Sequence, residues 1–127
     1  MTAPNWIEAV VRDFGQGAGI TNFALNDRGV AACRFETGVS LRFEYVGEEF
    51  IVAVTVPSVN SAAVARRILA VAHPEARYGA AIRAGYLTKS GCAVFAVRIT
   101  AQEVTLPILN TVFSALWRIA TEIGGAA

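Results

Sequence analysis

Three strand-like runs follow one another in the middle of the chain, with only short turns between them. The clearest run is 39–45, where Val, Leu, Phe and Tyr alternate with Ser, Arg and Glu. This period of two predicts a strand with one buried and one solvated face. Runs 30–36 and 50–56 flank it, and both joining segments contain glycine, so the three runs are expected to form an antiparallel meander.

Helical spacing of apolar residues marks the segments 3–16, 61–73 and 102–123, and two further strand-like runs cover 81–88 and 92–100. The predicted order is therefore α-β-β-β-α-β-β-α. Because the strands come in groups and do not alternate one for one with helices, the pattern predicts an α+β fold. We expect a twisted, mainly antiparallel sheet packed with helices.

Glycine and proline are expected to punctuate the helices. The first helix should be capped by Thr2, carry Pro4 in its first turn and stop at Gly15 and Gly17. Pro107 should split a short leading turn from the last helix.

The chain is more apolar than one small core is expected to need. Its 127 residues correspond to a single domain, 1–127, and they are 54% hydrophobic and 17% charged. Neither long uncharged run, 50–65 or 104–117, reaches the ~18 apolar residues of a spanning helix, so no membrane insertion is expected. The surplus instead predicts a partner, either a second copy of the chain or an apolar peptide.

Charge and motifs argue against several other classes of function. Lysine and arginine number 11 and the acids 10, a net charge of +1 with no basic cluster, so no nucleic-acid partner is expected. The single histidine, His73, is interpreted as a helix-end residue. With no catalytic or phosphate-binding motif and too few ligands for a metal, we predict no enzyme, no cofactor and no metal site.

Two acidic groups, Glu36 with Glu44 and Glu48 with Glu49, are interpreted as charges that discourage sheet aggregation. Cys33 and Cys92 are expected to be reduced thiols of a cytosolic protein, because the N-terminus has no secretory signal.

The element order and several local segments resemble the class I type III secretion chaperones, the Tir-chaperone family. The apolar first helix breaks at Phe14 and Gly15, and residues 23–30, Phe-Ala-Leu-Asn-Asp-Arg-Gly-Val, resemble the family's entry into its first strand. Residues 37–41, Thr-Gly-Val-Ser-Leu, are similar to its turn before the second strand. The resemblance covers nearly the whole chain.

This resemblance implies a non-catalytic homodimer of the bacterial cytoplasm. It would bind the chaperone-binding segment near the N-terminus of a secreted effector and keep it competent for export. The implied dimer contact comprises Val64, Ile68, Val71, Ile82 and Tyr86. The implied effector-binding residues are Trp6, Val10, Phe14, Leu25, Val30 and Ala32. An extended peptide could also add a strand to a sheet edge while its side chains fill apolar pockets.

Family members are usually acidic, whereas this chain is near neutral, so we expect binding that depends only weakly on salt. Two alternatives remain open. One is a small-ligand or enzymatic domain with an apolar pocket between sheet and last helix, lined by Leu106, Leu109, Phe113 and Trp117. The other is an adaptor that binds a folded partner.

Overall fold

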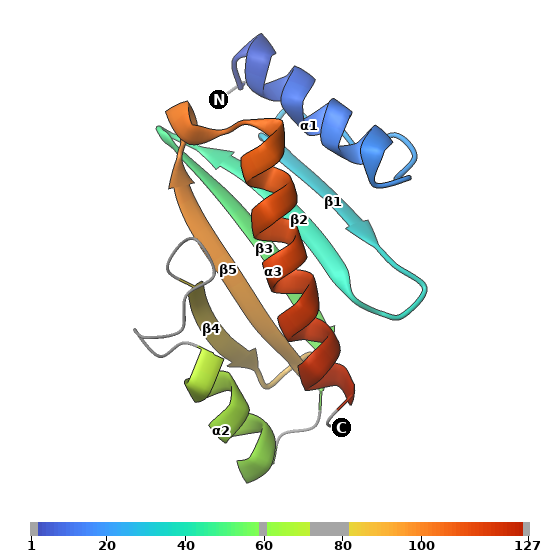
Figure 1. The fold of residues 1–127 in the computed structure, drawn as a ribbon, viewed down its shortest axis with the longest axis vertical. Coiled ribbons are helices and arrows are strands. Elements are labelled where there is room, and N and C mark those ends of the chain that lie inside the picture. The colour runs from blue at the N-terminus through green and yellow to red at the C-terminus, as the bar shows by residue number, and fades with distance from the viewer. Residues whose placement is uncertain (1–2, 59–60, 72–81, 126–127) are drawn as a thin grey trace.

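The computed structural model describes residues 3–58, 61–71 and 82–125 (Figure 1). Its elements follow the predicted α+β order with one added 3-10 turn, η1. In chain order they are α1 (Asn5–Gly17), β1 (Val30–Arg34), β2 (Ser40–Val46), β3 (Glu49–Pro57), α2 (Ala62–Val71), β4 (Ile82–Leu87), β5 (Cys92–Thr100), η1 (Ala101–Glu103) and α3 (Leu106–Gly125).

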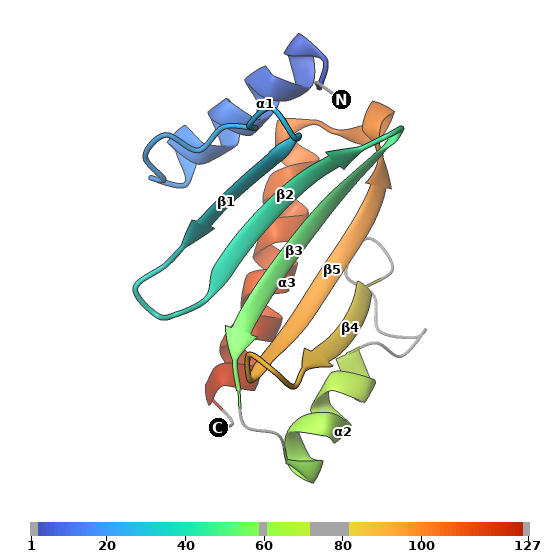
Figure 2. The same ribbon diagram turned by 180° about the vertical axis from the view of Figure 1, so that it is seen from behind.

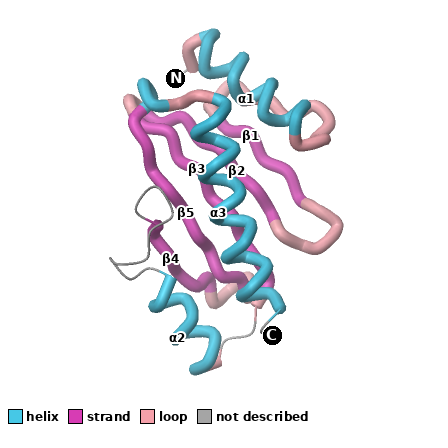
Figure 3. The backbone as a smooth tube through the Cα atoms, viewed as in Figure 1, coloured by secondary structure: helices cyan, strands magenta, loops and turns pink. Residues whose placement is uncertain are grey.

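The five strands form one sheet in the order β1-β2-β3-β5-β4, and every neighbouring pair is antiparallel. The strands β1 and β4 are therefore the two edges. Helices α1 and α3 cover one face, and α2 lies beside β4 at the far end (Figures 1 and 3). Seen from behind, the strands lie in front of α3, and none of the described helices crosses that face (Figure 2).

The core lies between α3 and the covered face of the sheet. Every second residue of β3, from Phe50 to Val56, is buried there, whereas the residues between them are half-buried on the open face. Four phenylalanines continue this core toward α1. Their ring centroids are 4.9 Å apart for Phe14 and Phe43, 5.2 Å for Phe23 and Phe43, and 5.4 Å for Phe43 and Phe50. Phe43 thus joins the sheet to the first helix and its connector.

The predicted start of the first helix was wrong, and of the two predicted stop residues only Gly17 ends the helix. The helix begins after Pro4, which occupies the N-cap position without a side-chain hydrogen bond, and it runs through Gly15 to Gly17. Thr2 lies outside the described residues. Gly15 is needed for packing, because a Cβ atom at this position would lie 2.7 Å from the Cβ of Phe23. The glycine therefore lets the connector cross the helix closely.

A separate turn precedes the last helix, as we predicted from the position of Pro107. Residues Ala101–Glu103 form η1, and Thr100 caps it. The hydroxyl and the backbone N–H of Thr100 donate to a carboxylate oxygen of Glu103 at 2.7 and 3.2 Å. These bonds stabilise the charged carboxylate and lower the pKa of Glu103.

The second helix begins as predicted, with the Ser61 hydroxyl accepting the N–H of Val64 at 3.2 Å. His73, the predicted helix-end residue, lies outside the described residues.

Replacing Phe43 by alanine should lower the free energy of unfolding by about 3–5 kcal/mol, because the ring is fully buried among three other phenylalanines. Urea unfolding followed by circular dichroism measures the loss. Phe35→Ala is the matched control, since Phe35 is half-buried and should cost about 1–2 kcal/mol. Equal losses for the two variants would contradict this description of the core.

Candidate functional site

Along β1, one edge of the sheet has backbone groups that no strand of the described residues pairs with. The N–H of Tyr45 donates to the carbonyl oxygen of Gly29, and the N–H of Phe35 donates to that of Val39, each at 2.8 Å. Antiparallel bonding repeats every second residue, so Ala31 and Cys33 also bond toward β2. Residues 30, 32 and 34 therefore direct their N–H and C=O groups outward, away from the sheet.

An aromatic patch, defined here as Phe35, Phe113 and Trp117, lies beside this edge on the helix side of the sheet. The ring centroid of Phe35 lies 5.0 Å from that of Trp117 and 6.3 Å from that of Phe113. All three side chains are half-buried and pack against the core. The side chain of Cys33 also points to the helix side of the sheet, because Cys33 lies opposite the buried Leu41 of β2. The patch thus offers apolar contact area next to free backbone groups.

The residues predicted to bind an effector occupy different environments. Trp6 is 47% exposed on α1, whereas Val10, Leu25 and Val30 are half-buried and Ala32 is exposed. Val30 and Ala32 lie opposite Glu44 and Arg42 and so face the open side of the sheet.

Phe14 needs a correction, because only 1% of its side chain is exposed. It lies inside the core, with its ring centroid 5.4 Å from that of Phe113, and it presents no surface to a partner. Phe35 was missed by the sequence reading. Its position just after an edge strand, in phase with Cys33, was the signal that could have found it.

Most residues of the predicted dimer contact are already buried within one protomer. Val64 and Ile68 of α2 and Ile82 of β4 have 2%, 8% and 9% exposure, because α2 packs on β4 and α3. The Tyr86 hydroxyl donates to the carbonyl oxygen of Ser58 at 3.0 Å and ties β4 to the end of β3. The side chain of Val71 lies outside the described part of the chain.

The opposite side of α2 remains in contact with solvent. Leu69 is 70% exposed, and Ala62, Ala65 and Arg66 are exposed with it. Ala62, Ala65 and Leu69 are separated by three and four residues, and Arg66 lies three residues before Leu69, so the four share one helix face.

The open face of the sheet combines a small apolar centre with charged margins. Ile51 and Ala53 of β3 and Val94 and Ala96 of β5 are half-buried without a covering helix among the described elements. Ion pairs border this centre. Arg42 lies 3.1 Å from Glu44, and Arg98 lies 3.0 Å from Glu49, measured between the guanidinium nitrogen and carboxylate oxygen.

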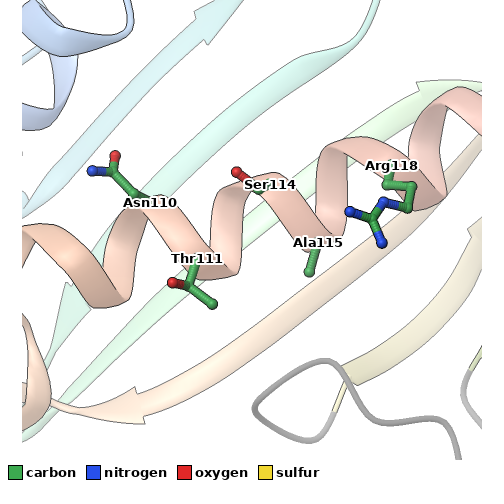
Figure 4. A pocket seen from close by; sticks show the side chains of 5 residues that line it. All are labelled: Asn110, Thr111, Ser114, Ala115 and Arg118. Carbon is green, nitrogen blue, oxygen red and sulfur yellow. The ribbon is translucent and has the colours of Figure 1, made fainter.

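The space between the sheet and α3 is filled, which counts against a small-ligand pocket there. Leu109 is fully buried, and Phe113 and Trp117 pack against the core. A hollow of about 430 Å³ lies instead on the outward side of α3, where Asn110, Thr111, Ser114, Ala115 and Arg118 line it (Figure 4). It is an open hollow lined mainly by residues with polar side chains, unlike an enclosed apolar site.

The two thiols lie on different strands and opposite faces. Cys33 is on the helix side of β1 and Cys92 on the open side of β5, and both are free. Burial raises the pKa of the Cys33 thiol, and the hydrogen bond with the Leu41 backbone opposes this effect only in part.

The described residues contain neither a candidate metal site nor a candidate membrane span. No group of three or more His, Cys, Asp or Glu side chains is placed to hold a metal ion. No helix in the same residues combines the length and apolar character that crossing a bilayer requires.

The family comparison decides the identity of the fold. A family model, described as type III secretory system chaperone SycN, matches residues 6–124. The chain belongs to this family. The predicted resemblance to type III secretion chaperones is therefore confirmed. A comparison with curated proteins finds no significant match.

Solved structures share the fold of this SycN-family chain at low sequence identity. The ExsC–ExsE complex has a TM-score of 0.78 and 16% identity, covering 98% of this chain and 95% of that one. The Yersinia pestis chaperone SycH, solved with a fragment of YscM2, has a TM-score of 0.71 and 14% identity. The match covers 92% of this chain and 98% of that one. A chain of the Pseudomonas aeruginosa ExoU–SpcU heterodimeric complex has a TM-score of 0.68 and 14% identity. The match covers 94% of this chain and 95% of that one.

Alkylation by iodoacetamide should be slower at Cys33 in the folded chain than in the urea-unfolded chain at the same pH. A raised pKa leaves a smaller thiolate fraction, and the thiolate is the nucleophile. The midpoint of the rate against pH should therefore shift upward on folding. A Cys92→Ser variant isolates the signal of Cys33, and equal midpoints in the two states would contradict the burial of this thiol.

Proposed function

We propose that this chain is a non-catalytic chaperone that holds the N-terminal chaperone-binding segment of a type III secreted effector in an extended, export-competent form. The match of the chaperone family over residues 6–124 carries this proposal. Its site of action would be the bacterial cytoplasm. One similar solved chain comes from the HopA1–SchA chaperone–effector complex, and another is the chaperone SycH in complex with a fragment of YscM2. These complexes support a protein segment as the client.

The β1 edge and the aromatic patch supply the two kinds of contact that an extended client needs. Outward N–H and C=O groups of Ala32 and Arg34 can bond to the client backbone, each bond contributing about 0.5–1.5 kcal/mol. Apolar client side chains on the helix side would cover Phe35 and Trp117, contributing about 25 cal/mol per Å² of apolar area removed from water. Backbone bonding of this kind tolerates many client sequences.

Electrostatic attraction contributes little to this mode of binding. The net charge is +1, and two arginines of the open sheet face already pair with Glu44 and Glu49. Exposed charges are screened within about 10 Å at 0.1 M salt. Client affinity should therefore change only weakly with ionic strength.

We also propose that two copies associate through the outward face of α2. Leu69, Ala62 and Ala65 expose apolar surface on the side of α2 that faces away from β4 and α3, and the small alanines allow two helices to approach closely. Leu87 of the adjoining β4 is 52% exposed, but it lies opposite Cys92 and so faces the open side of the sheet, outside this contact. A two-fold axis would bury both copies of Leu69 at once. This assignment moves the predicted contact from the inner to the outer side of α2.

Leu69→Asp should convert the dimer to a monomer, because it places a charge in the apolar contact while the fold loses no buried side chain. Light scattering coupled to size-exclusion chromatography measures the mass at micromolar concentration. Val46→Asp is the matched control, since Val46 is also an exposed apolar residue but lies on β2, away from α2. A Leu69→Asp protein that remains dimeric would contradict this interface.

Capture of the tagged wild-type chain from bacterial cytosol should recover a secreted protein, whose bound segment stays sensitive to limited proteolysis where it is not covered. Phe35→Asp should weaken binding of that client by about 2 kcal/mol, roughly thirtyfold in Kd, because the aromatic patch loses the member that directly follows β1.

The control for this experiment is Ser114→Asp, which adds the same charge on the outward side of α3. Isothermal titration calorimetry compares the two variants with the wild type. Recovery of only a folded, protease-resistant partner would contradict the chaperone function and favour an adaptor. Equal weakening by both variants would place the client elsewhere on the chain.

A further inference from the structure

The turn that precedes β1 occupies part of its free edge. The side-chain oxygen of Asn26 accepts the N–H of Val30 at 3.1 Å and that of Arg28 at 2.8 Å. The backbone N–H of Asn26 in turn donates to the carbonyl oxygen of Val30 at 2.8 Å. Both outward backbone groups of Val30 are thus bonded from outside the sheet by a single residue.

Glycine at position 29 makes this arrangement possible. Gly29 has a φ of +77°, and a Cβ atom there would lie 2.8 Å from the carbonyl oxygen of Tyr45. The N–H of Gly29 donates to the carbonyl oxygen of Asn26 at 2.9 Å and closes the turn. The turn therefore folds back tightly enough to place Asn26 beside the edge of β1.

We infer that Asn26 ends the strand-pairing edge of β1 and thereby sets the register in which a client strand is bound, an inference that rests on the proposed function. With Val30 occupied, only Ala32 and Arg34 offer outward groups within the strand. A client therefore bonds to these two residues and stops before Val30. Asn26 acts as a positioning residue, since it limits where the client lies.

This register also fixes which client side chains face which surface. Directly opposed residues of paired strands point to the same face of a sheet. The client residue opposite Cys33 therefore points to the helix side, next to the aromatic patch, and should be apolar. The residue opposite Arg34 points to the open face, where an acidic or polar side chain fits the guanidinium.

A second copy of β1 is a poorer occupant of the same edge than a client strand. Only two residues of each copy could pair, which is short for a strand, and each copy brings the positive charge of Arg34 to the joint. A disordered client has no such restriction, because its backbone can continue past the edge and cover the aromatic patch.

Hydrogen exchange measured by NMR on the complex tests this inference. The probe is the client fragment that survives limited proteolysis of the captured complex. In the wild-type chain, the fragment should slow exchange of the Ala32 and Arg34 amides roughly tenfold, while the Val30 amide, already bonded to Asn26, should change little.

Asn26→Ala removes the side-chain acceptor, so the Val30 amide should exchange faster in the free variant and become protected when the fragment binds. Asn26→Asp keeps an acceptor oxygen and should behave as wild type. Asp27→Ala, in the same turn, controls for general loosening of the loop.

The outcomes separate this inference from the proposed function. If the fragment binds but leaves the Ala32 and Arg34 amides unchanged, the β1 edge is not used and the inference is overturned, whereas the chaperone function stands. Protection of Val30 by the fragment in the wild-type chain would also overturn it, because Asn26 would then not stop the pairing. If no client fragment binds at all, the proposed function itself fails.

Discussion

Packing of aromatic rings on one face of the sheet is the constraint on which the rest of the structure depends. Phe43 lies at its centre, with Phe14 from α1 and Phe50 from the next strand against it. Because α1 and α3 both bury their apolar sides on this face, no described helix covers the other face and no described strand pairs with β1 on its outer side (Figures 1 and 2). The strand β1 can then contribute side chains to the core and, at the same time, offer its outward backbone groups to a partner.

The same one-sided packing explains where the surplus of apolar residues lies. Most of it is inside the protomer, since Val64, Ile68 and Phe14 are buried. Outside the core, the large apolar side chains that are exposed among the described residues are Trp6, Val46, Leu69 and Leu87, and the half-buried aromatic patch lies beside β1. Leu69 and the aromatic patch are the two parts on which the proposals rest. Two limited surfaces suit two separate partners, a second copy of the chain and an extended client, better than one large interface would.

Sequence patterns predicted the element order well because the periods of two and 3.6 are strong in residues 39–45 and in the helices. The alternation also predicted the correct grouping of the strands, and the antiparallel sheet followed from that grouping.

The sequence patterns failed where long-range packing determines the role of a residue. Gly15 was expected to stop a helix, but its role is to let Phe23 approach, and no local signal shows that. Phe14 and Ile68 were apolar in the right places, yet only the three-dimensional packing reveals that they face inward. The blocking of Val30 by Asn26 depends on how a turn folds back on a sheet edge, which the sequence does not specify.

A crystal structure of the chain with its captured client addresses the central claim most directly. The account predicts an extended client backbone bonded to Ala32 and Arg34, with an apolar side chain resting against Phe35. A client bound as a folded domain, with the β1 edge and the aromatic patch left uncovered, would contradict it.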